Sequence, residues 1–245
     1  MRKQHRHIHI GTSGWSYDHW KGPFYPGDLP GKQMLEYYAQ HFRSVEINSS
    51  FYRLPDKKTL QHWYACTPDD FLFTAKASRY ITHMKKLMEP QKTVPPFLNR
   101  ISILEDKLGP ILFQLPPHWR FNAERLSTFL DSLSNDFRYA LEFRDQSWLN
   151  RQTFELLARH NMSFCIYELE GFTAPEEITA DYIYVRLHGH GDAYQGRYSS
   201  KALSGWAGTF TDWAQQGNTV YCYFDNDQLG YAAKNAGQLQ KILSQ

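Results

Sequence analysis

Cysteine is scarce in this chain of 245 residues, which contains only three. Cys66, Cys165 and Cys222 are far apart and form no CxxC pair, so the sequence supports neither a disulfide framework nor a zinc knuckle. We therefore expect reduced thiols and a cytoplasmic protein.

Long apolar runs are also missing. No stretch of the sequence approaches the roughly 18 apolar residues of a membrane-spanning helix. The first residues, MRKQHRHIHIG, are basic, but the apolar segment that a secretory signal needs does not follow them. The sequence thus predicts a protein that is neither exported nor inserted into a membrane.

Net charge of either sign is small, because 27 lysines and arginines against 25 aspartates and glutamates leave a formal +2. This excess is too low for a polycation that binds nucleic acid over its whole surface, although a local basic site stays open. Apolar residues make up 42% of the chain and aromatic residues 16%. Disorder is excluded, since such a composition can bury a large core.

The apolar periodicity alternates along the chain between about two residues and about 3.6. Short β-branched and aromatic runs predict eight strands, at residues 7–12, 44–48, 71–76, 110–115, 138–144, 163–168, 182–188 and 219–225. Helical patterns lie between them, at residues 32–41, 57–66, 96–107, 123–134, 151–160, 200–216 and 229–243. The segment between the sixth and seventh strands is too short and too rich in proline for a full helix.

This order and size predict a single TIM-type (β/α)8 barrel over residues 1–245, with a long aromatic-rich loop after the first strand. The strand faces agree with a barrel. Leu141 and Phe143 alternate with Glu142 and Arg144, whereas a strand covered by helices on both faces would be more continuously apolar. Polar residues therefore gather at the C-terminal strand ends, where this fold builds its active sites.

Charged residues of both signs are expected to meet at this end of the barrel. The cations are Lys76, Arg144 and Arg186, and the carboxylates are Glu46, Glu142 and Asp225. Two carboxylates facing a substrate from opposite sides can act as general acid and base, and Glu46 and Glu142 are the candidates. The alternative is a closed layer of salt bridges that plugs the barrel without doing chemistry.

Aromatic residues concentrate in the predicted loops over the same end. Trp15, Tyr52 and Trp148 could stack on a sugar or a nucleobase. The alternative is that these rings only pack the loops onto the barrel.

No metal ligand set is predicted. Glu46, Glu142, Asp225 and His188 could form a divalent site, but only one histidine reaches the barrel mouth and the HxH spacing of a zinc site does not occur there. We expect no cofactor, and any divalent requirement is expected to be weak and magnesium-like.

Six ordered blocks carry a resemblance to a known family: HIGTSGWSYDHWKGPFYP, SVEINSSFYRLP, LGPILFQLPP, ALEFRDQSW, YVRLHG and YFDND. They resemble the bacterial and archaeal family called domain of unknown function 72, over about residues 8–243. The resemblance implies a TIM-type barrel and no established reaction. The family's characteristic residues correspond here to Trp15, Glu46, Asn48, Phe51, Tyr52, Lys76, Gln114, Glu142, Arg144, Trp148, Arg186, His188 and Asn226. Its last block usually has asparagine where Asp225 stands.

The sequence favours an enzyme that acts by acid/base chemistry on a small polar anion, such as a sugar phosphate or a nucleotide-like molecule. Glu46, Glu142 and His188 are the predicted catalytic residues. The predicted substrate-binding residues are Trp15, Asn48, Tyr52, Lys76, Gln114, Arg144, Trp148, Arg186 and Asn226. Hydrolysis, isomerisation and elimination suit this set equally. Two alternatives stay open: a nucleic-acid-binding or phosphodiester-processing protein similar in fold to metal-dependent endonucleases, and a non-catalytic small-molecule sensor.

Overall fold

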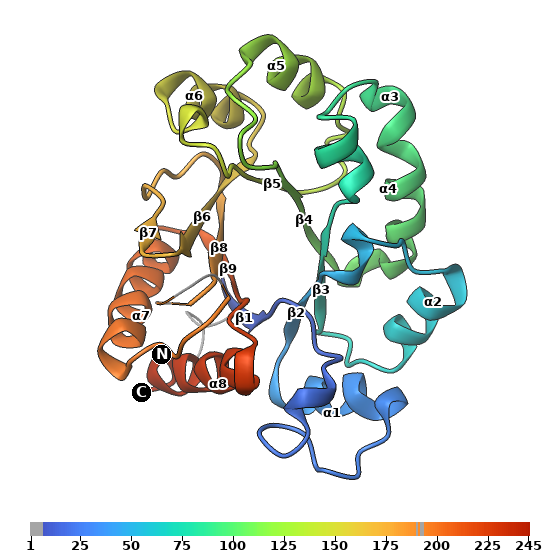
Figure 1. The fold of residues 1–245 in the computed structure, drawn as a ribbon, viewed down its shortest axis with the longest axis vertical. Helices are drawn as coiled ribbons and strands as arrows, with labels where there is room; N and C mark the ends of the chain where they lie inside the picture. The colour runs from blue at the N-terminus through green and yellow to red at the C-terminus, as the bar shows by residue number, and fades with distance from the viewer. Residues whose placement is uncertain (1–6, 190, 192–193) are drawn as a thin grey trace.

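A computed structural model describes residues 7–189, 191 and 194–245. Eight parallel strands form a nearly closed barrel with helices around the outside (Figure 1). The strands are β1 (Ile8–Thr12), β2 (Ser44–Ile47), β3 (Leu72–Lys76), β4 (Leu108–Gln114), β5 (Tyr139–Glu142), β6 (Ser163–Leu169), β8 (Tyr182–Leu187) and β9 (Thr219–Phe224). The predicted barrel and its eight strands are confirmed.

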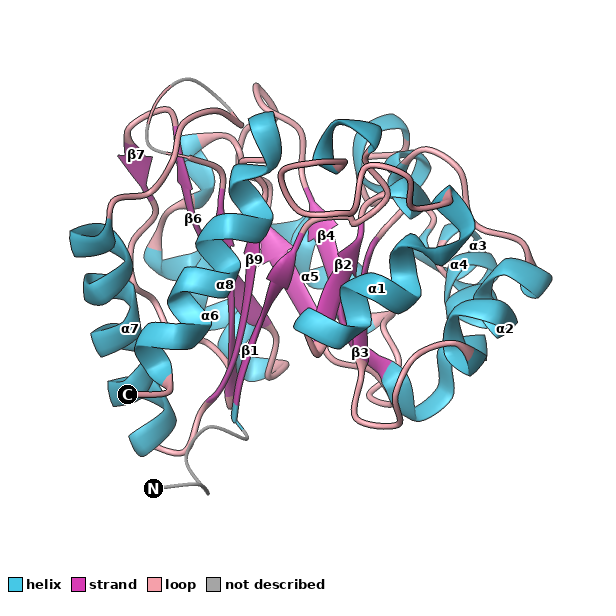
Figure 2. Ribbon diagram, turned by 90° about the horizontal axis from the view of Figure 1, so that it is seen from below, coloured by secondary structure: helices cyan, strands magenta, loops and turns pink. Residues whose placement is uncertain are grey.

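Eight α-helices occur in the described residues and flank the strands (Figure 2). They are α1 (Met34–His41), α2 (Lys57–Ala65), α3 (Pro90–Thr93), α4 (Pro95–Ile101), α5 (Ala123–Asp131), α6 (Arg151–Arg159), α7 (Ser200–Gln215) and α8 (Tyr231–Leu243). Asp56 and Asn122 cap α2 and α5, because their side chains accept hydrogen bonds from backbone N–H groups three residues later. Within the described residues, every helix is too short or too polar to span a bilayer.

The connection between β6 and β8 contains no helix, as the sequence predicts. A short strand, β7 (Phe172–Thr173), folds back antiparallel against the end of β6 instead. The short helix α3 was not expected. It begins at Pro90, and proline is well suited to the first turn of a helix because its missing N–H would be unpaired there.

The barrel has one weak seam, between β1 and β2. Every other neighbouring pair of barrel strands forms a ladder, whereas β1 and β2 are joined by a single bridge between Ser13 and Glu46. The hydroxyl of Tyr38 fills the gap beside it: it accepts from the backbone N–H of Thr12 at 2.9 Å and donates to the carbonyl of Ser44 at 3.1 Å. The seam is thus closed by a side chain.

Tyrosines fill the lower interior of the barrel. Tyr182, Tyr184, Tyr221 and Tyr223 are buried there together with small and aliphatic side chains. Their hydroxyls find partners, as buried tyrosines require: that of Tyr184, for example, lies 2.7 Å from Oε2 of Glu46. The tyrosine layer therefore supports a charged layer above it.

The long loop after β1 packs against the barrel. Trp20 and Tyr25 are almost completely buried, and the Tyr25 hydroxyl donates to the carbonyl of Trp15 at 2.6 Å. Most rings of this loop are therefore core side chains that hold the loop over the barrel.

Candidate functional site

The upper barrel interior is a network of charges centred on Arg186. The guanidinium donates to both oxygens of Glu46 at 2.8 and 3.1 Å, to Glu142 at 2.9 Å and to Asp225 at 2.8 Å. These residues lie on or directly after β2, β5, β8 and β9, and Arg186, Glu46 and Glu142 are completely buried. The alternation of faces inferred from the sequence thus brings Glu46, Glu142 and Arg186 together.

The two glutamates have further partners besides Arg186. Glu46 accepts hydrogen bonds from the hydroxyls of Ser13 at 2.5 Å and Tyr184 at 2.7 Å. Glu142 accepts from Gln114 at 2.9 Å and from Arg144. Burial opposes the ionisation of Glu142, but the charges of Arg144 and Arg186 outweigh it and hold its pKa well below the usual range.

Asp225 adds a third carboxylate, at the position where the resemblance described above implies asparagine. Burial disfavours its charge, but Arg186 and His188 lower its pKa to about 2. Three carboxylates and one guanidinium would leave an excess of negative charge. Arg144, which donates to Glu142, offsets part of it.

His188 is neutral in this network, with its proton on Nδ1. Its Nε2 lies 3.2 Å from Arg144 Nη2 and 3.4 Å from Arg186 Nη1. Because guanidinium nitrogens only donate, Nε2 must accept. Nδ1 lies 3.0 Å from Oδ2 of Asp225, but the two atoms do not meet the geometry of a hydrogen bond. Burial, followed by the charge of Arg186, lowers the pKa of His188.

Lys76, Arg144 and Asp225 are the charged residues of the network that solvent still reaches. Lys76 is 7% exposed and the side chain of Arg144 is 10% exposed. The ammonium of Lys76 lies 4.4 Å from the centre of the Phe51 ring, and the guanidinium of Arg144 lies 5.2 Å from that of Tyr167. Both cations are held against aromatic faces, which stabilise a positive charge.

An aromatic pocket of about 460 Å³ opens beside the ends of β1 and β2. It is lined by Gly14, Trp15, Ser16, Tyr17, Asn48, Ser49, Tyr52 and Trp63. Three predicted binding residues, Trp15, Asn48 and Tyr52, are therefore brought together. The side-chain amide oxygen of Asn48, Oδ1, is buried and has no hydrogen-bond partner among the described residues, so it is free to accept one from a ligand.

Two predicted binding residues lie outside both the network and the pocket. Trp148 is completely buried, and its Nε1 donates to the carbonyl of Trp119 at 2.5 Å. The amide of Asn226 donates to Gly196 at 2.8 Å and to Asn235 at 3.0 Å. In this structure Trp148 packs the core, and Asn226 ties the loop before α7 to α8.

Sequence reasoning missed two partners of Glu46. Ser13, in the GTSG segment at residues 11–14, is not among the predicted site residues, yet its hydroxyl donates to the carboxylate of Glu46. Tyr184 was counted only as a strand residue. Its position two residues before Arg186 on the same face could have indicated that it points inward.

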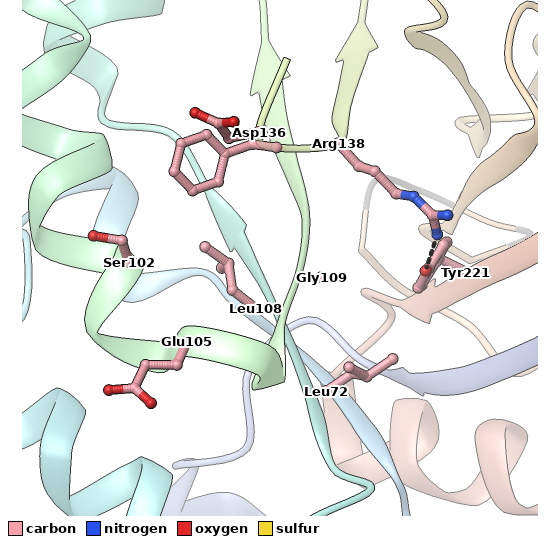
Figure 3. A pocket seen from close by; sticks show the side chains of 9 residues that line it. Leu72, Ser102, Glu105, Leu108, Gly109, Asp136, Arg138 and Tyr221 are labelled. Carbon is pink, nitrogen blue, oxygen red and sulfur yellow. Dashed lines mark hydrogen bonds between the residues drawn. The ribbon is translucent and has the colours of Figure 1, made fainter. Parts of the chain in front are cut away.

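A second pocket, of about 520 Å³, lies at the opposite end of the barrel, where β3, β4 and β5 begin. Figure 3 shows Arg138 donating to the hydroxyl of Tyr221, at a distance of 3.0 Å. Asp136 and Glu105 also line it, but none of the predicted site residues does. In this fold, polar residues at the N-terminal end generally serve stability rather than catalysis.

The donor geometry does not suit a metal ion. Among the described residues, no three histidine, cysteine, aspartate or glutamate side chains are arranged to hold one. The carboxylates that could do so converge on Arg186, whose guanidinium takes the central place of a cation.

We therefore expect the purified protein to contain no stoichiometric zinc. Tight zinc binding needs thiolate or several imidazole ligands, and here a single histidine reaches the network, with its Nε2 facing the guanidinium groups of Arg144 and Arg186. Elemental analysis after dialysis against a weak chelator checks this. One or more equivalents of retained zinc would contradict it and would favour an endonuclease-like function.

Comparisons with known proteins agree with the architecture. The structure of a DUF72 family protein from Thermotoga maritima superposes with a TM-score of 0.87 at 30% identity, covering 97% of this chain and 99% of that one. A DUF72 family structure from Enterococcus faecalis superposes with a TM-score of 0.82 at 21% identity, covering 97% and 96%. The second likeness supports the fold alone.

Sequence comparisons lead to the same family. The UPF0759 protein YunF of Bacillus subtilis is 26% identical over 96% of this chain and 94% of its own length. The UPF0759 protein YecE of Escherichia coli is 36% identical over 56% of this chain and 48% of its own length. The family model "Protein of unknown function DUF72" matches residues 9–245. Because this match covers nearly the whole sequence, the chain belongs to the DUF72 family.

Proposed function

We propose that this protein is an enzyme acting on a small anionic molecule that carries a ring. Lys76 and Arg144 would bind the anionic group, and the pocket around Trp15 and Tyr52 would bind the ring. The observation that supports this is that two cations of the network, Lys76 and Arg144, are partly exposed to solvent, whereas Arg186 is completely buried. Sugar phosphates and nucleotide-like molecules combine the two features.

The aromatic pocket and the charged network are neighbours. The backbone N–H of Gly14, a pocket residue, donates to the carbonyl of Glu46 at 2.8 Å. On the other side, the rings of Phe51 and Tyr52 are 5.0 Å apart, and Phe51 contacts the ammonium of Lys76. A ligand of nucleotide size could therefore contact both parts at once.

The buried carboxylates have a positioning role in this proposal. Each oxygen of Glu46 and Glu142 already accepts a hydrogen bond, and both residues are completely buried. Neither carboxylate is accessible to a substrate. We infer that they hold the guanidinium groups of Arg186 and Arg144 in position. Because His188 is as completely buried as the two glutamates, proton transfer then falls to Lys76, which is 7% exposed.

We expect a ring and an anion in one molecule to bind more tightly than either alone. Isothermal titration with adenosine 5′-monophosphate, adenosine and inorganic phosphate tests this. Arg144→Met should weaken binding of the nucleotide about tenfold or more, since a charge-assisted hydrogen bond contributes roughly 1.5–3 kcal/mol. Tyr52→Ala should remove the gain in affinity of the nucleotide over inorganic phosphate. Arg159→Met, at an exposed arginine of α6, should leave the affinity for all three ligands unchanged.

Salt dependence separates this proposal from a nucleic-acid function. Binding of a single phosphate group should weaken only slightly between low and physiological salt. Binding to duplex DNA instead falls with a slope of roughly −0.9 per neutralised phosphate on logarithmic axes. Submicromolar, steeply salt-dependent binding of an oligonucleotide, with no binding of the nucleotide, would contradict the proposal.

A further inference from the structure

The chain buries two lysines in opposite ways. Lys107 is 3% exposed, and its ammonium donates to the carbonyls of Tyr64 at 2.7 Å and Thr67 at 2.8 Å. Lys76 is 7% exposed, yet its ammonium makes no hydrogen bond or ion pair within the described part of the chain. Its near neighbour is the ring of Phe51. The ammonium of Lys107 therefore has hydrogen-bond acceptors, whereas that of Lys76 has none among the described residues.

A buried ammonium without acceptors is costly, and the group responds by giving up its proton. Burial, followed by the charge of Arg186, lowers the pKa of Lys76 to about 8. Asp225, Glu142 and Glu46 act in the opposite direction, and roughly a quarter of the Lys76 side chains carry a neutral amine at pH 7.5. An exposed lysine, with a pKa of about 10.4, is almost entirely protonated under the same conditions.

The backbone around Lys76 is held firmly. Ser50 donates from its hydroxyl to the carbonyl of Lys76 at 2.6 Å, and the next N–H, that of Ala77, donates to the carbonyl of Leu112 at 2.8 Å. The amine is thus presented from the rigid C-terminal end of β3, at a residue that is not completely buried. Catalytic groups on rigid elements are positioned more accurately than groups on loops.

We propose that Lys76 is a catalytic nucleophile that forms an imine with the carbonyl group of an aldehyde or ketone substrate. This inference deepens the proposed function and rests on it: the small anionic substrate would carry a carbonyl group, which Arg144 places within reach of the amine by binding the anion.

The step balances without a further reactant. The lone pair of the neutral amine attacks the carbonyl carbon, and a carbon–nitrogen bond forms as the carbonyl π bond opens. The two amine protons end on the departing oxygen, which leaves as water, and a carbon–nitrogen double bond remains. Hydrolysis of the product imine returns the amine. The imine nitrogen can be protonated to withdraw electrons from the neighbouring carbon, as other Schiff-base lysines do.

Reductive trapping tests the inference. The full-length protein is incubated at pH 7.5 with succinic semialdehyde and cyanoborohydride, and the modified lysines are located by peptide mass spectrometry. Lys76 should be modified about tenfold or more faster than Lys201, an exposed lysine of α7, because its neutral fraction is far larger. The rate at Lys76 should rise with pH to a plateau with a midpoint near 8.

Matched variants and probes separate the imine from the anion site. Lys76→Arg should abolish modification at this position, whereas Arg159→Met, at an exposed arginine of α6, should leave both the modification of Lys76 and nucleotide binding unchanged. Butyraldehyde has the same chain length as succinic semialdehyde but no carboxylate, and it should react more slowly at Lys76. If both aldehydes modify Lys76 equally fast, the proposed imine is supported and the proposed binding of the anionic group is wrong. If the nucleotide binds but Lys76 is modified no faster than Lys201, the imine proposal is wrong and the proposed function stands.

Discussion

Arg186→Met is expected to lower the free energy of unfolding by about 3–5 kcal/mol near pH 7.5, the usual cost of removing one partner from a buried ion network. The reason is the number of carboxylates that share this guanidinium. Glu46, Glu142 and Asp225 all accept hydrogen bonds from it, and without it they would be buried together facing one another. For a chain of this size the loss corresponds to a fall in melting temperature of roughly 6–20 °C.

The pH dependence of this loss has a definite sign. In the wild type, the pKa values of Glu142 and Asp225 lie below their ordinary values, so their stabilisation is present above about pH 4 and is lost as the pH falls through the folded values. In Arg186→Met the grouped carboxylates should have raised pKa values instead. The folded variant then binds protons more tightly than the unfolded chain, and acid stabilises it. The difference between the two proteins should be largest at pH 7–8 and should shrink toward pH 4.

Urea denaturation across this pH range measures the effect. Arg186→Lys keeps the positive charge but lacks the planar guanidinium that reaches three carboxylates. It should therefore be less stable than the wild type but more stable than the methionine variant. Arg159→Met is the control for removing an exposed arginine and should stay within about 0.5 kcal/mol of the wild type. A methionine variant as stable as the wild type at every pH would mean that the network is not what holds this part of the barrel together.

The barrel and its strand faces could be predicted because they depend on local patterns. A period of two sends alternate residues to opposite faces of a strand, so Glu142 and Arg186 could be assigned to the interior from the apolar residues on either side of them. The parallel order then brings the C-terminal ends of all strands to one end of the barrel. These steps use only the sequence neighbours of each residue, and the structure confirms them.

The partners of each side chain could not be predicted in the same way. Ser13 and Glu46 meet across the seam of the barrel, and nothing local to GTSG indicates which strand will approach it. Trp148 follows β5 and was expected at the rim. It is buried because the loop after β4 folds over it, where Phe121 lies 5.3 Å from its ring. Such contacts depend on where distant loops pack, which periodicity does not specify.

Gly11→Ala should destabilise the protein by about 3 kcal/mol, the upper end of the usual cost of overpacking. A methyl group at this position of β1 would lie 2.1 Å from the carbonyl oxygen of Ser44 and 2.8 Å from its carbonyl carbon. Both are backbone atoms of β2, so no side chain can rotate away to make room. The two strands must separate at the seam, which has no ladder to oppose the movement. The hydrogen bonds that Tyr38 makes across it would be strained as well.

Gly208→Ala is a control that should stabilise the protein instead of destabilising it. Gly208 is an exposed residue within α7, and an added methyl group there meets nothing within 4 Å. Alanine is the better helix former, so this variant should gain about 0.5–1 kcal/mol of stability.

Because Ser13 and Glu46 meet at the same seam, Gly11→Ala should also loosen the charged network and weaken nucleotide binding, whereas Gly208→Ala should not. Thermal melts and nucleotide titrations of both variants measure this. If Gly11→Ala matches the wild type in stability and binding, the seam is not a constraint on the site.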